Sequence, residues 1–267
     1  MIRLPELGRD PNSPFPPLSQ ALEEPEGLLA FGGDLTPQRL IHAYSQGIFP
    51  WYSEGQPILW WSPDPRMLLA ISELRISRSL RKHLRHSDWH ISANRDFEQV
   101  IDHCAGQARP GQNGTWITRE MRDAYCRLHQ GGVAHSIEVW RQHQMVGGIY
   151  GIALGQFFFG ESMFSIATNA SKTALVALCR AMELRGLRWL DGQVESDHLA
   201  SLGFQPRPRH DFALALSHNP QDLISLGTLD SATLQPPDLA RWIPQSAHAT
   251  SDSASGAAAP PGDPGPN

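Results

Sequence analysis

The sequence predicts an α+β fold whose central sheet is mainly antiparallel. Residues 136–141, 145–154 and 156–164 alternate apolar and polar side chains with the period of two that is typical of strands. Short polar or glycine-containing breaks separate these runs, so we expect an antiparallel meander. Helical patterns, with apolar residues three and four positions apart, precede and follow the meander. Strands grouped between helices are typical of the α+β class.

A small domain is expected over residues 1–75, before a larger domain over residues 76–243. Prolines are frequent in the first part of the small domain. Thr36 is a good helix N-cap and Pro37 suits the first helical position, so these residues predict a helix that ends near Gly47. Two aromatic-rich segments, residues 48–52 and 59–66, are predicted to be loops.

Capping residues and glycines delimit the predicted helices of the larger domain. Thr118 is the candidate N-cap of a helix within residues 116–130, which a pair of glycines ends. A second helix begins at Asn169 or Ser171 and ends at Gly186. We further expect a strand over residues 187–194, a helix over 197–202 and a strand over 212–216.

Composition limits the class of protein. The 267 residues carry a formal net charge of −5, so a nucleic-acid partner would have to meet a local basic patch. The three cysteines are far apart and form no Cys-x-x-Cys pair, which is typical of a reduced compartment. No run approaches the ~20 apolar residues of a membrane span, so we expect a cytoplasmic protein without a membrane partner. Residues 244–267, which are poor in apolar side chains, are predicted to be a disordered tail.

Residues 72–86 form a basic stretch in which Glu73 is the only acid. The spacings of three and four put most of the cations on one helical face. Acids are missing from the neighbouring i±4 positions, where a merely solvated helix usually has them. Two interpretations stay open, a solvated helix face and a phosphate-binding surface. The cations are Arg75, Arg78, Arg81, Lys82 and Arg85.

Several cofactor motifs are incomplete. Ser171-Lys172-Thr173 lacks the glycine that a phosphate-binding P-loop needs before its lysine. The order of meander, helix and strand is that of the GNAT-type acyltransferase fold, but residues 165–172 contain no glycine for a coenzyme A pyrophosphate. The histidine series at positions 83, 86 and 90 lacks the further ligands of a metal site. We therefore expect neither a cofactor nor a metal.

Asp191 and Gln193 are two positions apart on a predicted strand, so their side chains are expected on one face. In a half-buried pocket, the acid would orient the amide, whose oxygen could accept a hydrogen bond from an amine nucleophile. An ordinary edge-strand pair is the alternative interpretation.

Glu161 lies inside an apolar, aromatic strand that runs from Phe157 to Phe164. Burying an unpaired carboxylate costs several kcal/mol, roughly, so Glu161 needs a cationic or hydrogen-bonding partner. An internal Arg or Lys is one candidate. A ligand ammonium beside a Phe/Met pocket is the other.

The sequence blocks around these residues closely resemble the bacterial leucyl/phenylalanyl-tRNA–protein transferase family. The resemblance runs from about residue 15 to residue 212 and consists of seven ordered blocks. They are residues 26–35, 47–52, 60–66, 114–118, 135–140, 160–165 and 169–175.

The resemblance implies an aminoacyltransferase with a GNAT-like C-terminal domain. Such enzymes move Leu or Phe, and less well Met, from aminoacyl-tRNA to the α-amino group of proteins that begin with Arg or Lys. The new peptide bond marks the acceptor for N-end-rule degradation. No metal or coenzyme is implied, because the aminoacyl ester is already activated.

The family's residue roles fall on three groups of positions. Asp191 and Gln193 match the pair proposed to assist the attacking amine. The tRNA's terminal adenosine is expected at Trp51 and Trp116, with Tyr44 and Tyr125 nearby, and the basic stretch would hold tRNA phosphates. Glu161 is expected to meet the substrate ammonium, and the walls of the aminoacyl pocket would be Ile149, Phe158, Met163, Leu178, Met182 and Leu190.

Three of these pocket positions depart from the family's best-known pattern. Leu178 and Met182 replace two phenylalanines, and Ile149 replaces a methionine. The pocket stays apolar but changes shape, so the order of preference among Leu, Phe and Met is left open. A related acyltransferase with another donor or acceptor and a non-catalytic RNA-binding module are the alternative functions.

Overall fold

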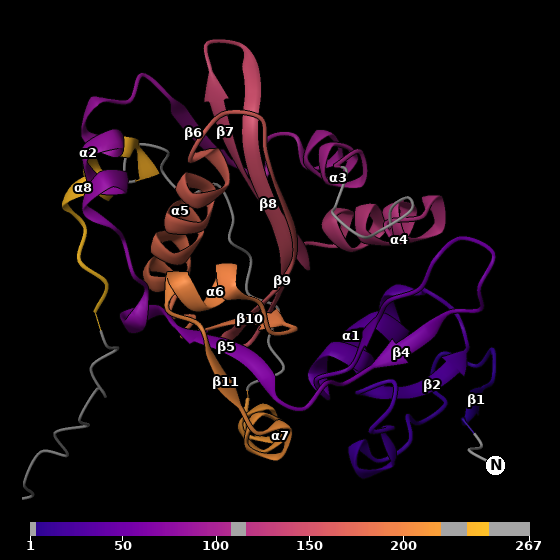
Figure 1. Cartoon of the computed structure of the whole chain (residues 1–267). Helices are drawn as coiled ribbons and strands as arrows, with labels where there is room; N and C mark the ends of the chain where they lie inside the picture. Colours follow the sequence, from indigo (N-terminus) through magenta and orange to yellow (C-terminus); the bar gives the residue numbers. More distant parts are fainter. Residues whose placement is uncertain (1–3, 108–115, 220–233, 246–267) are drawn as a thin grey trace, which may run out of the picture.

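The computed structural model describes residues 4–107, 116–219 and 234–245, which form two sheets with helices around them (Figure 1). The smaller sheet has the strand order β1-β2-β4-β3. The larger sheet has the order β11-β5-β10-β9-β8-β7-β6 and is mixed, mostly antiparallel. The predicted α+β class is therefore confirmed.

The smaller sheet contains β1 (Glu6–Leu7), β2 (Leu28–Gly32), β3 (Phe49–Pro50) and β4 (Leu59–Trp61). Helix α1 (Pro37–Ser45) begins as predicted at Thr36, whose hydroxyl accepts a hydrogen bond from the Arg39 amide. The two aromatic segments are not entirely loops, because Phe49–Pro50 and Leu59–Trp61 pair as antiparallel strands. Trp60 is fully buried there, and its indole nitrogen donates to the Gly32 carbonyl at 2.9 Å.

Strand β5 (Arg66–Ala70) belongs to the larger sheet, although it was expected within the N-terminal domain. It lies between β10 (Trp189–Gln193) and β11 (Gln205–Arg207) and is antiparallel to both. The chain therefore passes from one sheet to the other between Trp61 and Arg66, before the predicted boundary at residue 75. Because β5 pairs with strands more than 100 residues later in the chain, the local sequence gives no signal for this passage between sheets.

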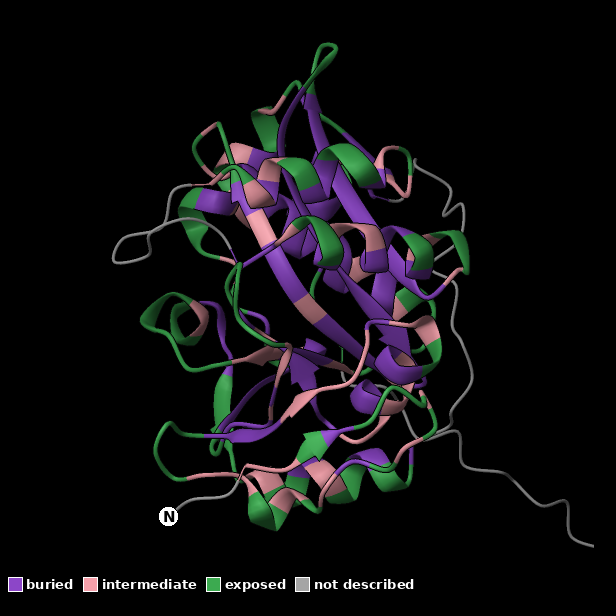
Figure 2. Ribbon diagram, turned by 90° about the vertical axis from the view of Figure 1, so that its right-hand side faces the viewer, coloured by how far each residue is buried: buried purple, intermediate pink, exposed green. Residues whose placement is uncertain are grey.

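The predicted meander is confirmed by β7 (Ala134–Arg141), β8 (Gln144–Leu154) and β9 (Phe157–Ser165), which pair antiparallel in order. Strand β6 (His90–Ala93) extends the sheet beside β7. The next strand, β10, runs parallel to β9. Strands β7, β8 and β9 are buried along most of their length (Figure 2).

Helices cover both faces of the larger sheet (Figure 1). Helix α5 (Ala170–Leu184) packs on one face, and its buried side chains join the core cluster of Phe158 and Leu190. Helices α3 (Phe97–Ala105) and α4 (Arg119–Gln130) pack on the other face, in the cluster that contains Phe157 and Phe159. Neighbouring residues of β9 thus face different layers, as the alternation of a strand requires.

The remaining helices surround the ends of the sheet. Helix α2 (Arg78–His86) lies beside α8 (Pro236–Arg241), and α6 (Asp197–Leu202) precedes β11. Two short 3₁₀ turns lie at Leu18–Gln20 and Ile71–Glu73. Among the described helices, no segment is both long and apolar enough to cross a membrane.

The strand predicted over residues 212–216 is wrong, because this segment belongs to helix α7 (Arg209–Ser217). Phe212 and Leu216 are both buried, one helical turn apart, against the Gly47 region. Their spacing of four fits a helix. Helices α3 and α8 had no counterpart in the predicted elements. The predicted tail lies outside the described residues beyond Gln245.

Candidate functional site

A cavity of about 390 Å³ lies where four segments of the chain meet. One segment is Phe49–Trp51 of the small sheet, and another is Trp116 before helix α4. Strand β9 contributes Glu161, and the fourth segment is residues 192–196 at the end of β10. The structure therefore brings Trp51, Trp116, Glu161 and Gln193, all predicted site residues, to one place.

Glu161 is buried, and its carboxylate is held by three neutral donors from three elements. The Tyr44 hydroxyl of α1 donates to Oε1 at 2.7 Å, and the Tyr125 hydroxyl of α4 donates to Oε2 at 2.7 Å. The side-chain amide nitrogen of Gln193, Nε2, donates to Oε1 at 2.8 Å. The two tyrosine hydroxyls also lie 2.5 Å from each other. The partners are hydroxyl and amide groups, not the internal Arg or Lys that was one of the predicted alternatives.

Burial changes the acid–base properties of this cluster. Removal from water raises the pKa of Glu161 to about 7, although the hydrogen bonds from Tyr44 and Tyr125 act to lower it. Burial is the larger cause, and the nearby charge of Glu161 the second, that raises the pKa of each tyrosine well above the ordinary value for a tyrosine. The tyrosines therefore stay protonated donors, while Glu161 changes its charge close to neutral pH.

A β-bulge explains how Glu161 reaches the tyrosines. Tyr150 is paired with Ser162, whereas the next residue, Gly151, is paired with Gly160, so Glu161 is an extra residue in the strand. A Cβ atom at Gly151 would lie 2.1 Å from the Phe159 carbonyl oxygen, so the bulge requires glycine there. This irregularity has no signature in the alternation of the sequence, and we did not predict it.

Asp191 is fully buried and forms an ion pair with Arg66 of β5. Arg66 donates from Nε to Oδ1 at 2.9 Å and from Nη2 to Oδ2 at 2.6 Å. The backbone amide of Gln193 donates to Oδ1 at 2.8 Å. Both carboxylate oxygens of Asp191 are thus occupied, and Asp191 is not among the residues that line the cavity.

The prediction that the side chains of Asp191 and Gln193 lie on one face of the strand is therefore wrong. The pairing with β5 shifts between these residues, and Gln193 has a φ of 63°, in the left-handed region. Regular alternation does not extend through such a shift. Asp191 instead contacts the backbone of Gln193, while the Gln193 side chain turns toward Glu161.

The expected walls of the aminoacyl pocket lie in the core behind the cavity. Five of them are fully or almost fully buried in the cluster under α5, and Met163 packs against that cluster. Glu161 faces the other layer, with Tyr44 and Tyr125. The structure does not bring this apolar set into the cavity that Glu161 lines. The five buried residues are Ile149, Phe158, Leu178, Met182 and Leu190.

The aromatic residues expected at the adenosine divide into two pairs. Trp51 and Trp116 line the cavity, and Trp51 also packs against Trp61 with ring centroids 5.6 Å apart. Tyr44 and Tyr125 are fully buried and contact Glu161 instead of lining the cavity. The tryptophans thus form an aromatic wall of the cavity, and the tyrosines support the carboxylate.

The basic stretch lies on and before helix α2, at the other end of the large sheet from α1 (Figure 1). Arg75, Arg78, Lys82 and Arg85 are exposed. Arg81 is half-buried, and its Nη1 donates to the carbonyls of Ala240 and Trp242 at 3.0 and 2.9 Å. Arg81 therefore fastens α8 to α2, a role that its spacing in the sequence did not indicate.

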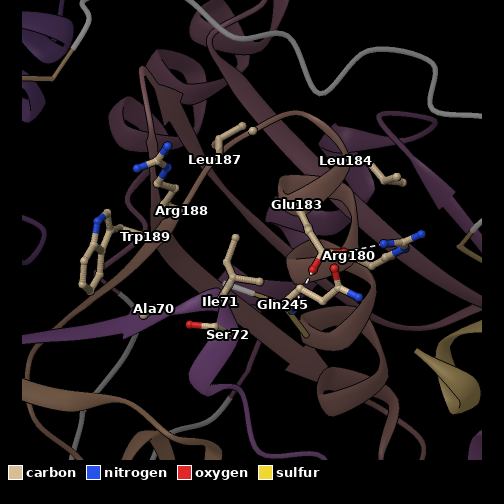
Figure 3. A pocket seen from close by; sticks show the side chains of 11 residues that line it. Ala70, Ile71, Ser72, Arg180, Glu183, Leu184, Leu187, Arg188, Trp189 and Gln245 are labelled. Atoms are coloured by element: carbon tan, nitrogen blue, oxygen red, sulfur yellow. Dashed lines mark hydrogen bonds and ion pairs between the residues drawn. The ribbon is translucent and has the colours of Figure 1, made fainter. Parts of the chain in front are cut away.

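A second cavity, of about 440 Å³, lies at the end of α5 and the start of β10 (Figure 3). Arg180 and Glu183 pair on its α5 side, and Gln245 donates its backbone amide to Glu183. Trp189 and Arg188 lie on the opposite side in this view. The cavity contains none of the predicted site residues. Within the described residues, no group of three or more His, Cys, Asp or Glu could hold a metal ion.

The sequence matches two family descriptions over most of its described length. Residues 68–217 match the family described as leucyl/phenylalanyl-tRNA protein transferase. Residues 33–64 match the N-terminal domain of the same family. Together the matched segments include every residue that lines the candidate cavity.

Curated relatives and solved structures extend this comparison. A leucyl/phenylalanyl-tRNA–protein transferase of Xanthomonas euvesicatoria pv. vesicatoria is 57% identical over 206 residues, 77% of this chain and 82% of the relative. One from Stutzerimonas stutzeri is 56% identical over 211 residues, 79% of this chain and 92% of the relative.

Two solved structures are distant neighbours. A GCN5-related N-acetyltransferase from Kribbella flavida has a TM-score of 0.31 at 12% identity, covering 64% of this chain and 61% of that one. The structure of L-PGS from Bacillus licheniformis has a TM-score of 0.36 at 9% identity, covering 64% and 57%. By the family match and the identity to its relatives, this chain belongs to the leucyl/phenylalanyl-tRNA protein transferase family.

Proposed function

We propose that this enzyme transfers leucine or phenylalanine, and less well methionine, from aminoacyl-tRNA to proteins that begin with Arg or Lys. The family implies an aminoacyl-tRNA donor and a protein acceptor. The observation that carries the proposal is the cavity in which Trp51 and Trp116 meet Glu161 and Gln193. An aromatic wall beside a carboxylate and an amide suits a ligand with a nucleobase at one end and an ammonium at the other.

The tryptophan wall would receive the terminal adenosine of the tRNA. A base that stacks on an aromatic side chain contributes about 1–3 kcal/mol of binding free energy, whatever its sequence context. Both indoles line the cavity, and Trp51 is oriented by its contact with Trp61, whose indole nitrogen donates to the Trp51 carbonyl at 2.6 Å. This end of the cavity is therefore prepared to bind the base before the donor arrives.

Glu161 would bind the α-ammonium of the aminoacyl group. An ionised carboxylate has roughly four acceptor positions. Two on Oε1 are taken by Tyr44 and Gln193, and one on Oε2 is taken by Tyr125. One position on Oε2 is left for a donor in the cavity, and none of the hydrogen-bond partners of Glu161 among the described residues is a cation.

Gln193 would orient the attacking amine. Its amide nitrogen is tied to Glu161, which leaves the amide oxygen as acceptor for an N–H of the acceptor α-amine. The amine nitrogen bonds to the ester carbonyl carbon, the bond from that carbon to the ribose oxygen breaks, and the amine loses one proton. Since Asp191 is fully buried, is paired with Arg66 and does not line the cavity, we assign the proton to the departing ribose oxygen.

The acceptor's cationic side chain would meet Glu195. This residue lines the cavity and is exposed, whereas Glu161 and Asp191 are already held by internal donors. A carboxylate at the rim attracts a guanidinium or an ammonium and does not attract a neutral or acidic N-terminal side chain. We therefore infer that Glu195 contributes to the choice of Arg or Lys.

The decisive experiment supplies radiolabelled leucyl-tRNA and a peptide that begins with Arg. Label is expected in the peptide, and ribonuclease treatment of the donor before the assay is expected to abolish it. The same peptide with an acetylated N-terminus is the matched control and should stay unlabelled. Transfer that does not depend on tRNA would favour an acyltransferase with another donor, and tRNA binding without transfer would favour an RNA-binding module.

The exposed cations of α2 would contact tRNA phosphates. Charge reversal of Arg78 and Lys82 together should weaken tRNA binding and flatten its dependence on salt, because fewer counterions are released. Arg9→Glu, which changes an exposed cation outside this helix, is the control. If tRNA affinity and the salt slope stay at the parent values in the α2 variant, the phosphates are bound elsewhere.

A further inference from the structure

Arg66 is a fully buried cation with polar contacts from three guanidinium nitrogens. Nε and Nη2 bind the two carboxylate oxygens of Asp191, and Nη1 donates to the Gly47 carbonyl at 3.0 Å. A planar guanidinium with both its carboxylate and its carbonyl partners in place has little freedom to rotate. The side chain therefore joins strand β10 to the loop that follows α1.

Two aromatic rings enclose the same guanidinium. The Cζ atom lies 4.9 Å from the ring centroid of Phe49 and 4.9 Å from that of Phe212. The packing around it is tight, because a Cβ atom at Gly47 would lie 2.9 Å from the Phe212 ring. Arg66 is thus held by β10, by the segment from Gly47 to Phe49 and by α7.

These contacts reach both walls of the candidate cavity. Phe49 is part of the wall that continues into Trp51. Asp191 precedes the other wall and accepts a hydrogen bond from the backbone amide of Gln193. Gln193 has a φ of 63°, and its side chain turns toward Glu161. A single buried side chain therefore sits between the segment that carries the aromatic wall and the segment that carries the amide.

We propose that Arg66 is a positioning residue that fixes the tryptophan wall and the side-chain amide of Gln193 relative to each other. The inference rests on the proposed function, in which the tryptophan wall binds the adenosine of the donor and Gln193 orients the attacking amine. Stability alone does not require a buried ion pair, because well-packed apolar residues of similar volume often replace such a pair without loss. The bidentate contact, the carbonyl contact and the two rings together favour positioning.

The first test removes the whole pair with Arg66→Met and Asp191→Leu in one full-length variant. Its melting temperature should stay near that of the parent, because no unpaired buried charge remains. Its kcat for transfer should nevertheless fall about 10- to 100-fold, with a smaller change in KM for the acceptor peptide. A variant with the parent kcat would overturn the proposal.

The second test uses Arg66→Lys, which keeps the charge but cannot make all three contacts. Its matched control is Arg39→Lys, because Arg39 is also fully buried and holds Asp34 together with the carbonyls of Gly8 and Asp10. We expect kcat to fall about tenfold in the Arg66 variant and to stay within about twofold in the Arg39 variant. Equal kcat values in the two variants would contradict a positioning role, whatever their melting temperatures.

A binding measurement separates this inference from the proposed function. The probe is an amide-linked phenylalanyl-adenosine, which cannot transfer its aminoacyl group, and the signal is tryptophan fluorescence. Affinity should fall about tenfold in Arg66→Lys and remain at the parent value in Arg39→Lys. Absence of transfer by the parent enzyme would refute the proposed function, whereas unchanged affinity in Arg66→Lys would refute the role of Arg66.

Discussion

Two buried carboxylates lie on neighbouring parallel strands, and the protein treats them in opposite ways. Asp191 of β10 is sealed from solvent and paired with Arg66. Glu161 of β9 borders the cavity and is held by two hydroxyls and an amide. The first charge is neutralised inside the fold, whereas the second is solvated by neutral donors. A neutral shell leaves a net negative charge available to a cationic substrate.

The same contrast explains the raised pKa of Glu161. Hydrogen bonds from neutral groups replace only part of the solvation that a carboxylate loses on burial, so its pKa rises to about 7. The guanidinium beside Asp191 supplies opposite charge and two charge-assisted hydrogen bonds. In our proposal, Asp191 serves the geometry of the site and Glu161 serves its chemistry.

The largest expected effect is on stability and tests the Asp191 half of the comparison. Asp191→Ala leaves Arg66 buried and unpaired, so the free energy of unfolding should fall by about 3–5 kcal/mol. Glu161→Ala should cost less, about 1–3 kcal/mol, because the donors that it leaves without an acceptor are neutral. Urea unfolding measures both values, and equal losses would remove the proposed distinction.

The next effect is on transfer and tests the Glu161 half. Glu161→Gln removes the charge but keeps the shape, so kcat/KM should fall roughly 10- to 100-fold, as expected for a lost charge-assisted contact of about 1.5–3 kcal/mol. Glu138→Gln is the control, because Glu138 is also fully buried and accepts from the hydroxyls of Ser92 and Ser136 outside the cavity. If both variants lose activity equally, burial and not position would explain the loss.

The pH dependence of transfer sharpens the comparison further. The ionised form of Glu161 binds the substrate ammonium in our proposal, so kcat/KM should rise with pH through about 7. Tyr125→Phe removes a hydrogen bond that favours the ionised form, and should therefore move this acid limb to higher pH. Cys179→Ala, a change in the α5 core, should leave it in place. An acid limb that Tyr125→Phe does not move would assign the titration to another group.

Stability should show the opposite pH trend. Because the pKa of Glu161 is raised from 4.5 to about 7 on folding, the folded state binds the proton more tightly than the unfolded state. Its contribution to stability is therefore complete below about pH 4.5 and is lost as the pH rises to about 7. Glu161→Gln should flatten this part of the curve of unfolding free energy against pH. Subtraction of the Glu161→Gln curve from the parent curve isolates the effect, and a flat difference over this range would contradict the raised pKa.

The smallest effect concerns the exposed carboxylate at the rim. Glu195→Gln should raise KM for an Arg-initiated peptide by about two- to fivefold, because exposed ion pairs contribute little in water. The increase should shrink at high salt. Asp197→Asn, another exposed acid two residues later that does not line the cavity, should leave KM unchanged. Equal changes in both variants would indicate general electrostatic attraction and not a contact.

Local patterns predicted much of the fold. Thr36 and Thr118 each cap a helix as expected, since a cap depends on residues within one turn. The period of two predicted the meander from β7 to β9. The segment 212–216 was misassigned because its short apolar run fits either period, and its burial against Gly47 decides for a helix.

The candidate site was predicted in part. The sequence alone marked Glu161, because a carboxylate in an apolar strand needs a partner, and Gln193, because it lies two positions from Asp191 on a predicted strand. Resemblance to the family marked the two tryptophans. The sequence did not identify Arg66 as the partner of Asp191, 125 residues away, or the bulge that turns Glu161 toward the tyrosines. The buried positions of Phe158 and Leu190 likewise follow from which face of the sheet α5 covers.

The sequence by itself determined several of the helices, the meander, the family and the candidate residues Glu161 and Gln193, because caps, periodicity and motifs are properties of neighbouring positions. Only the tertiary structure decided which buried carboxylate is neutralised and which stays available. That choice depends on contacts between β5, β9, β10, α1 and α4, whose strand register and burial arise when distant segments pack together.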